Sequence, residues 1–216
     1  MKFTLTLILC FVFSLTFGQE LPDLTKYKHD IGFNTTMLLN GILYSTTSPF
    51  DIMYKRQKSS NAALRVGGSV YVNTNLTTWS VTPNYEKRQN YSGSLTLGKE
   101  KQNQLSKKWI FNYGADMGIF YEQSNQEAYY NSVLAYRSVN LTAGGIAAPF
   151  LGIRFHINEK LYLSTEASLR ISYGRELTQW ETFNTDGSLA TERKEGFNNL
   201  TLQIQPAAGI FIFYRF

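Results

Sequence analysis

The sequence predicts an all-β protein, an eight-stranded antiparallel up-and-down barrel that crosses a membrane. The stretch Leu200–Phe216 alternates apolar and more polar residues with a period of two, and it is far longer than the roughly six residues of an average soluble strand. Charged residues are only 17% of the chain, yet the mean hydropathy is −0.24, which does not fit a helical membrane protein. Aromatic residues reach 15%, nearly all of them Tyr or Phe. Membrane barrels have this composition because only alternate residues of each strand face lipid.

Residues 1–18 have the pattern of a secretory signal peptide. Lys2 precedes the apolar run Leu5–Phe17, and small residues follow near Gly18. The run is shorter than the roughly 20 residues that a membrane-spanning helix needs. The one cysteine, Cys10, lies inside it, so the mature chain would contain neither a disulfide nor a reactive thiol. A short periplasmic lead-in is expected over 19–29, and the barrel over 30–216.

Four strands are expected in the first half of the chain, each with an apolar row opposed by a polar one. Their bounds are 31–43, 50–56, 64–72 and 91–98. A Ser/Thr/Pro turn separates the first two, and Gln57–Ser60 forms a tight polar turn after the second. The polar segment Asn73–Gln89 predicts a long connection between the third and fourth strands, and Lys99–Lys108 predicts the next turn.

The other four strands are expected at 109–122, up to His156, at 161–173 and at 200–216. Pro149 predicts a bulge or bend in the sixth, since proline cannot donate to the ladder. Residues 123–140 and 176–196 predict two further long connections, and Asp186-Gly187 predicts a hairpin tip whose flanks continue the strands beyond the bilayer. Long connections after the third, fifth and seventh strands alternate with short ones after the second, fourth and sixth, although the connection after the first strand, on the long side, is also short. This pattern predicts that both termini lie at the short-turn, periplasmic end.

Alternation does not decide which row faces outward, because a soluble lipocalin-like barrel is apolar inside. Three features favour an apolar exterior. The polar row is mostly Gly, Ser, Thr and Asn, unlike a water-facing surface. No charge interrupts the apolar rows of the expected strands. Aromatic residues lie at both ends of those rows, as at the two interfaces of a bilayer. They are Tyr54, Trp109, Phe111, Phe155, Tyr214 and Phe216 at one end, and Tyr91, Tyr121 and Tyr173 at the other.

The mature chain resembles the small eight-stranded outer-membrane barrels of Gram-negative bacteria, of the OmpX and OmpA-domain type. The residues that carry the resemblance most specifically are Ile210, Ile212, Tyr214 and Phe216, an alternating apolar run with a final aromatic. They are similar to the signal that the barrel assembly machinery reads in that family. The resemblance implies a monomer in the lipid bilayer of the cell outer membrane, with that machinery as a partner.

Five charged residues fall on the row expected to face the lumen. They are Arg65, Asp116, Arg154, Glu166 and Arg170. They could form a selectivity or conduction site, or a packed ion-pair network that fills the interior. The second interpretation is favoured because eight strands enclose little more than their own side chains, and because both signs of charge are present to pair.

The sequence predicts no catalytic, cofactor or metal site. His29 and His156 both fall at periplasmic strand ends, and neither lies near a serine and an acid at the outer end. No basic block indicates nucleic-acid binding. The connections are rich in Asn, Tyr, Ser and Trp, which suits adaptable recognition of an unknown extracellular ligand. We therefore expect a non-enzymatic outer-membrane barrel, structural or presenting loops. A lipid-modifying enzyme acting on lipid A, a narrow pore and a soluble secreted barrel are the alternatives.

Overall fold

The computed structural model describes residues 26–35, 49–78, 84–206 and 209–216, and these form nine antiparallel strands of one sheet. The strands are β1 (His29–Asn34), β2 (Phe50–Ser59), β3 (Ala62–Thr78), β4 (Tyr85–Gln104), β5 (Trp109–Tyr130), β6 (Val133–His156), β7 (Leu161–Phe183), β8 (Leu189–Gln205) and β9 (Phe211–Arg215). Within these residues no helix is long and apolar enough to span a bilayer. The predicted signal peptide, 1–18, most of the lead-in and residues 36–43 of the first expected strand lie outside the described residues.

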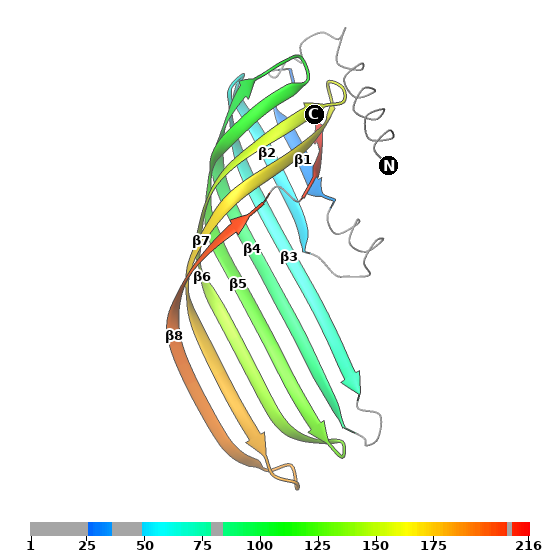
Figure 1. Cartoon of the computed structure of the whole chain (residues 1–216), viewed down its shortest axis with the longest axis vertical. Helices are drawn as coiled ribbons and strands as arrows, with labels where there is room; N and C mark the ends of the chain where they lie inside the picture. Colours follow the sequence, from blue (N-terminus) through cyan, green and yellow to red (C-terminus); the bar gives the residue numbers. More distant parts are fainter. Residues whose placement is uncertain (1–25, 36–48, 79–83, 207–208) are drawn as a thin grey trace, which may run out of the picture.

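The sheet closes into a ring of eight strand positions at the end where β1 begins and β9 ends (Figure 1). Consecutive strands pair from β1 to β7, and β9 joins the two ends by pairing with both β7 and β1. Ile212 is opposite Leu163 on one side and Phe33 on the other. His29 and Phe216 exchange backbone hydrogen bonds of 3.1 and 2.8 Å. The predicted eight-stranded antiparallel up-and-down barrel is therefore confirmed.

The last strand is not one continuous element, as 200–216 was predicted to be. It is divided into β8 and β9, and Pro206, which has no N–H to donate, follows β8 directly. Ser168 of β7 is opposite Gln205, whereas Ser164 is opposite Phe211. Four steps along β7 thus correspond to six along the last strand. Because the difference is even, the outward row of β8 continues as the outward row of β9.

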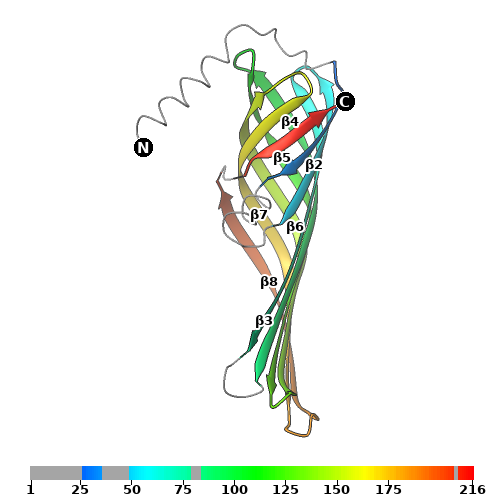
Figure 2. The same cartoon turned by 90° about the vertical axis from the view of Figure 1, so that its right-hand side faces the viewer.

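Six strands, β3 to β8, continue as one curved sheet well beyond the closed ring (Figures 1 and 2). The prediction of long connections over 73–89 and 123–140 is therefore wrong in part, because most of these residues lie in paired strands. Likewise β4 runs to Gln104 through much of the predicted turn at 99–108. These stretches carry polar residues on both faces, so they have ladder hydrogen bonds without the apolar alternation that identifies a strand.

Tight turns end the extended hairpins. Asn131 and Ser132 have positive φ angles of 50° and 65°, as the mirror-image turn of a two-residue hairpin requires. Gly187, with φ 81°, lies at the tip joining β7 and β8, where Asp186-Gly187 predicted one. Ser188 donates its backbone N–H and its hydroxyl to Asp186 at 2.9 and 2.6 Å, which lowers the pKa of that carboxyl below its usual value.

The bulge predicted at Pro149 is not formed. The register between β5 and β6 is continuous through Ala115 opposite Pro149. Only the ladder to β7 is interrupted, between Ala147 opposite Ile171 and Phe150 opposite Ser168, and the register is the same on both sides of the gap. Because Pro149 has no N–H to donate, the pairing of β6 with β7 is interrupted locally. No extra residue is inserted into either strand, so there is no bulge.

The apolar row faces outward and the charged row faces the lumen. Leu97, Met117 and Leu202 are 62, 69 and 67% exposed, whereas Lys55 and Glu100 on the opposite face are 0 and 1% exposed. This is the inside-out arrangement of a transmembrane β-barrel. The apolar row is not free of charge, however, because Arg56 follows Tyr54 on the outward row of β2, and Lys99 and Lys101 follow Leu97 on that of β4.

The outward row of β5 shows where the apolar belt ends. It is apolar and aromatic from Trp109 to Tyr121, enough for the 9–11 residues that a tilted strand needs to cross a bilayer. The strand then continues through Tyr130 with mostly polar residues, a further stretch of roughly 30 Å at about 3.3 Å per residue. The polar six-stranded part, here called the extension, comprises residues 71–78, 85–92, 122–141, 174–183 and 189–199.

Candidate functional site: the lumen and its pocket

The closed end of the barrel is filled by an ion-pair cluster centred on Glu100. Its carboxylate accepts from Lys55 Nζ at 2.8 Å and from Arg65 Nη1 at 3.3 Å, and it also pairs with Arg154. The side chains of Lys55 and Glu100 are fully buried and that of Arg154 is 1% exposed. Strand alternation places these residues here, because each lies on the inward row of β2, β3, β4 or β6.

Glu166 and Asp116 complete this cluster on the side facing the extension. Arg65 Nη2 is 2.8 Å from Glu166 Oε2, and its Nε is 3.0 Å from Asp116 Oδ1. Lys55 Nζ is 3.3 Å from Glu166 Oε1, which also accepts from the Asn112 amide at 3.2 Å. Three cations and three anions are thus brought together, so the group is formally neutral.

A second buried ion pair lies closer to the termini and is joined to the first group by two glutamines. Arg215 Nε is 3.2 Å from Asp30 Oδ1, and the Tyr162 hydroxyl donates to Asp30 Oδ2 at 3.0 Å. Gln57 donates to the same Asp30 oxygen at 2.9 Å, and Gln102 donates to Gln57 at 3.1 Å and to Glu100 at 2.8 Å. Every strand of the ring therefore contributes to one network, here called the lumen cluster.

Aromatic side chains close the gaps around the lumen cluster. The buried rings of Tyr162 and Phe213 stack with centroids 4.8 Å apart, and Lys55 Nζ lies 4.6 Å from the Phe213 centroid. Gly32 makes room for this ring, since a Cβ at that position would lie 2.4 Å from Phe213 Cε1. Met53 packs against the same two rings. With its charges paired and its gaps filled, this end of the barrel is a packed plug.

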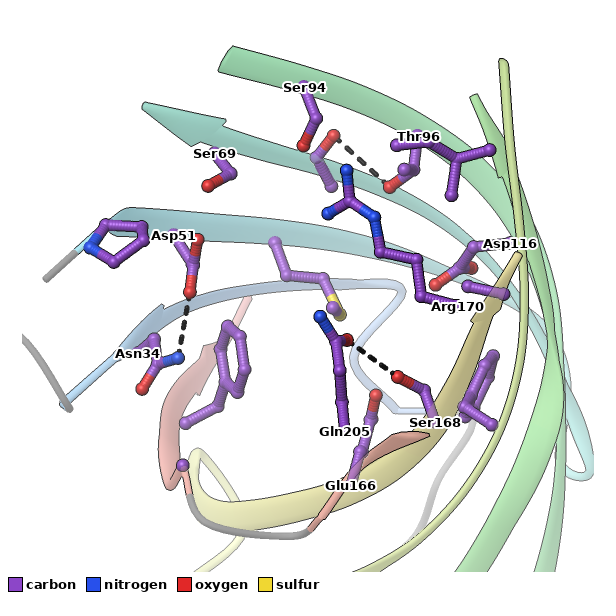
Figure 3. Close-up of a pocket in the computed structure, with 18 of the residues that line it drawn as sticks. Asn34, Asp51, Ser69, Ser94, Thr96, Asp116, Glu166, Ser168, Arg170 and Gln205 are labelled. Atoms are coloured by element: carbon purple, nitrogen blue, oxygen red, sulfur yellow. Dashed lines mark hydrogen bonds between the residues drawn. The ribbon is translucent and has the colours of Figure 1, made fainter. Parts of the chain in front are cut away.

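A pocket of about 480 Å³ adjoins the lumen cluster on the side of the extension, and Figure 3 shows side chains that line it. Arg65, Asp116 and Glu166 contribute to its lining. Hydroxyl and amide groups supply much of the rest, from Asn34, Ser69, Ser94, Thr96, Ser168, Gln203 and Gln205. Asn34 donates to Asp51 at 2.9 Å and Ser168 donates to Gln205 at 2.9 Å. The volume is within the range of small-molecule sites, but polar and apolar groups share the lining about equally, whereas such sites are usually lined predominantly by apolar side chains.

The structure places four of the five predicted lumen charges, Arg65, Asp116, Arg154 and Glu166, in one network. Arg170 also faces the lumen but does not join it. Its guanidinium lies in the pocket wall, 5.6 Å from the Phe120 ring and 3.9 Å from Glu122 Oε1.

Sequence reasoning missed four further charged members of the lumen cluster, Asp30, Lys55, Glu100 and Arg215. Lys55 and Arg215 alternate with apolar residues in the predicted strands, so their inward position was readable from the period of two. Asp30 lies one residue before the first predicted strand, and Glu100 lies in a segment predicted as a turn. A correct C-terminal bound for β4, at Gln104 instead of residue 98, would have placed Glu100 inside the barrel.

The two histidines lie at the end of the termini, as predicted, and both are in aromatic surroundings. His29 stacks between Tyr54 and Phe216, with centroids 5.9 and 5.6 Å away. His156 is 3% exposed and packs on Tyr162 at 5.0 Å. In the described part of the chain, no three His, Cys, Asp or Glu side chains are grouped as metal ligands.

The C-terminal residues of the predicted assembly signal share one outward row. Ile210, Ile212, Tyr214 and Phe216 are 41–54% exposed. Tyr214 is opposite Ile31 and Leu161, so the row is part of the closed ring. The side chains are therefore accessible from outside the barrel, at the seam between its first and last strands.

Comparison with known proteins gives few matches. No protein-family model matches the chain, and no curated protein matches its sequence. Among solved structures, the chain is similar to a major outer membrane protein from Thermus thermophilus. The match has 12% sequence identity and a TM-score of 0.41, and it covers 88% of this chain and all of that one.

Proposed function

We propose that this protein is a non-enzymatic, integral outer-membrane β-barrel that displays the extension on the cell surface. The observation that carries the proposal is the change of surface along the same strands. The outward row of β5 is apolar from Trp109 to Tyr121, whereas in the extension both faces of the sheet are mostly polar. A sheet with water on both sides belongs outside the bilayer, and its rigid strands can hold side chains for recognition better than loose loops can.

The orientation follows from the chain ends. The predicted signal peptide directs the chain across the inner membrane, and barrels of this class keep both termini in the periplasm. Both described ends lie at the plugged end of the barrel (Figure 2). The extension then points away from the cell, and an extracellular ligand would meet it first.

The extension carries side chains that suit such contact. Tyr85 and Tyr129 stack at 4.4 Å on its outward face, and the Arg193 guanidinium lies 5.7 Å from the Trp180 ring on the other face. Tyr, Trp and Arg are enriched among residues that dominate binding surfaces. The ligand would be a partner outside the cell, and the barrel itself would act as a monomeric anchor.

The plug favours a closed barrel over the narrow pore. The lumen cluster pairs each of its charges with another, and the rings of Tyr162 and Phe213 fill the space beside it. Ion conduction would require this network to open. A silent planar bilayer containing folded protein is the expected result, and steady single-channel currents would favour the pore.

Fractionation with a heat-modifiable gel shift tests the membrane proposal. The expected result is a protein in the outer-membrane fraction that migrates differently before and after boiling. Soluble protein without a shift would support the secreted barrel instead. Mass spectrometry of lipid A from a deletion strain tests the enzyme alternative. An unchanged acyl pattern is expected, and a lost or gained acyl group would overturn the non-enzymatic proposal.

A further inference from the structure

A cluster of four basic side chains lies on the outward face near the plugged end. Arg56 and Lys58 lie on the outward row of β2, and Lys99 and Lys101 lie on that of β4. Strand β3 runs between them, with Leu64 opposite both Arg56 and Lys99. We call these four residues the basic rim. Neighbouring strands are about 4.8 Å apart, so the four cations share one small area of the barrel wall.

The basic rim has no acidic counterpart among the described residues. All four side chains are exposed, and none of them forms an ion pair within that part of the chain. The described acids of this end are directed elsewhere. Asp30 and Glu100 point into the lumen, and the exposed Glu159 pairs with Lys26. The positive charge is therefore available to something outside the protein.

The position of the basic rim is that of lipid headgroups. Arg56 continues the outward row of Ile52 and Tyr54, and Lys99 continues that of Leu95 and Leu97. These apolar neighbours belong to the lipid-facing belt, so the long stems of the cations can lie along the acyl chains while their charged ends reach the interface. A partner in bulk water would have to enter the bilayer surface to meet them.

In the extension, four of the six basic residues are paired with nearby acids, whereas Lys87 and Arg175 form no ion pair within the described residues. The pairs are Arg88–Glu86, Arg137–Glu127, Arg137–Glu181, Arg193–Glu195 and Lys194–Glu192. The formal charge of +5 is thus unevenly distributed. Unpaired positive charge is concentrated at the membrane boundary on the side of the termini.

We propose that the basic rim binds the phosphates of anionic phospholipids in the leaflet on the side of the chain termini. The inference rests on the proposed membrane placement. Arg and Lys ends at this depth meet phosphodiester groups, and a negatively charged headgroup supplies the counter-ions that the protein lacks here. The contact would fix the depth and rotation of the barrel in its bilayer.

Native mass spectrometry of the detergent-folded protein tests this inference. The protein is mixed with equal amounts of dioleoyl phosphatidylglycerol and dioleoyl phosphatidylcholine, and the bound lipids are counted. The wild type is expected to retain phosphatidylglycerol preferentially. The fourfold variant Arg56→Gln, Lys58→Gln, Lys99→Gln, Lys101→Gln should lose roughly fivefold of the preference for each cation that lies near the headgroups, or about several hundredfold if all four contribute.

A charge-matched control removes four basic residues from the outward face of the extension. It carries Lys87→Gln, Arg137→Gln, Arg175→Gln and Lys194→Gln, and it should keep the wild-type preference. An equal loss in the control, or a wild type without preference, would overturn the inference. Soluble glycerol phosphate is added as a competitor, and displacement of the lipid at equal concentration would assign the surface to free phosphate instead. The gel shift is read in the same samples, so an intact shift without lipid preference refutes this inference alone.

Discussion

Glu100 is the residue whose replacement should disturb the lumen cluster most. It is fully buried and meets three cations, Lys55, Arg65 and Arg154. Glu100→Gln keeps the shape of the side chain and removes its charge. Lys55 and Arg65 retain Glu166, at 3.3 and 2.8 Å, so their charges stay compensated. Arg154 has no second acidic partner among the described residues, and it is 1% exposed.

The expected loss of unfolding free energy is about 3–5 kcal/mol, the cost of leaving one buried charge without its partner. Asp116→Asn is the matched control. It removes a carboxylate 3.0 Å from Arg65, but Arg65 keeps both Glu100 and Glu166. The control should therefore cost about 1 kcal/mol or less, the size of one replaceable hydrogen bond.

A double variant separates the effect of the unpaired Arg154 charge from the other effects of the substitution. Glu100→Gln combined with Arg154→Met removes the unpaired cation and keeps an unbranched side chain of similar length. If the unpaired charge of Arg154 causes most of the loss, the double variant should regain about 2 kcal/mol or more of unfolding free energy relative to Glu100→Gln alone.

Urea-induced unfolding in lipid vesicles, followed by the heat-modifiable gel shift, measures these differences. If the Glu100→Gln variant were as stable as the wild type, the claim that buried Arg154 needs Glu100 as its partner would be contradicted. A double variant as unstable as the single one would show that the cost arises from another member of the network.

Three further predictions follow from the same structure. Leu97→Arg, in the apolar belt, should cost about 2–4 kcal/mol of unfolding free energy in vesicles, whereas Leu76→Arg in the extension should change it by less than about 0.5 kcal/mol; equal effects would contradict the belt. Gly32→Ala should cost about 1–3 kcal/mol by the same assay, because the new methyl meets the Phe213 ring, and an unchanged stability would show that the ring moves freely. Phe216→Ala should lower the yield of assembled barrel in cells while leaving refolding in detergent intact; normal cellular yield would refute its role as an assembly signal.

The closed half of the barrel was predictable from the sequence because its two faces meet different media. Apolar residues at every second position of 109–122 and 161–173 identify strands and their outward row. In the extension, the same strands have polar residues on both faces. A composition rich in Tyr, Thr, Asn and Gln without alternation is typical of a loop, so these strands were not predicted. The pairing that defines strands here comes from neighbours far apart in sequence, which a periodicity search does not detect.

The lumen cluster was only partly predictable for a related reason. Arg65 and Glu166 stand out as isolated charges among small residues, so their inward position was clear. Glu100 lies among Lys99, Lys101 and two glutamines, a composition typical of a turn. Its pairing with both neighbouring strands, opposite Ala63 of β3 and Gly114 of β5, shows that β4 is still in the wall at that point.

The central claim is that one row of side chains faces lipid in the barrel and water in the extension. Spin labels at Met117→Cys and Leu76→Cys test it directly, because both native side chains are highly exposed, at 69 and 62%, and the only native cysteine lies in the predicted signal peptide. In vesicles, the label at Met117 should be relaxed by oxygen dissolved in the bilayer, and the label at Leu76 by a water-soluble nickel complex. Nickel relaxation at Met117 equal to that at Leu76 would contradict the account.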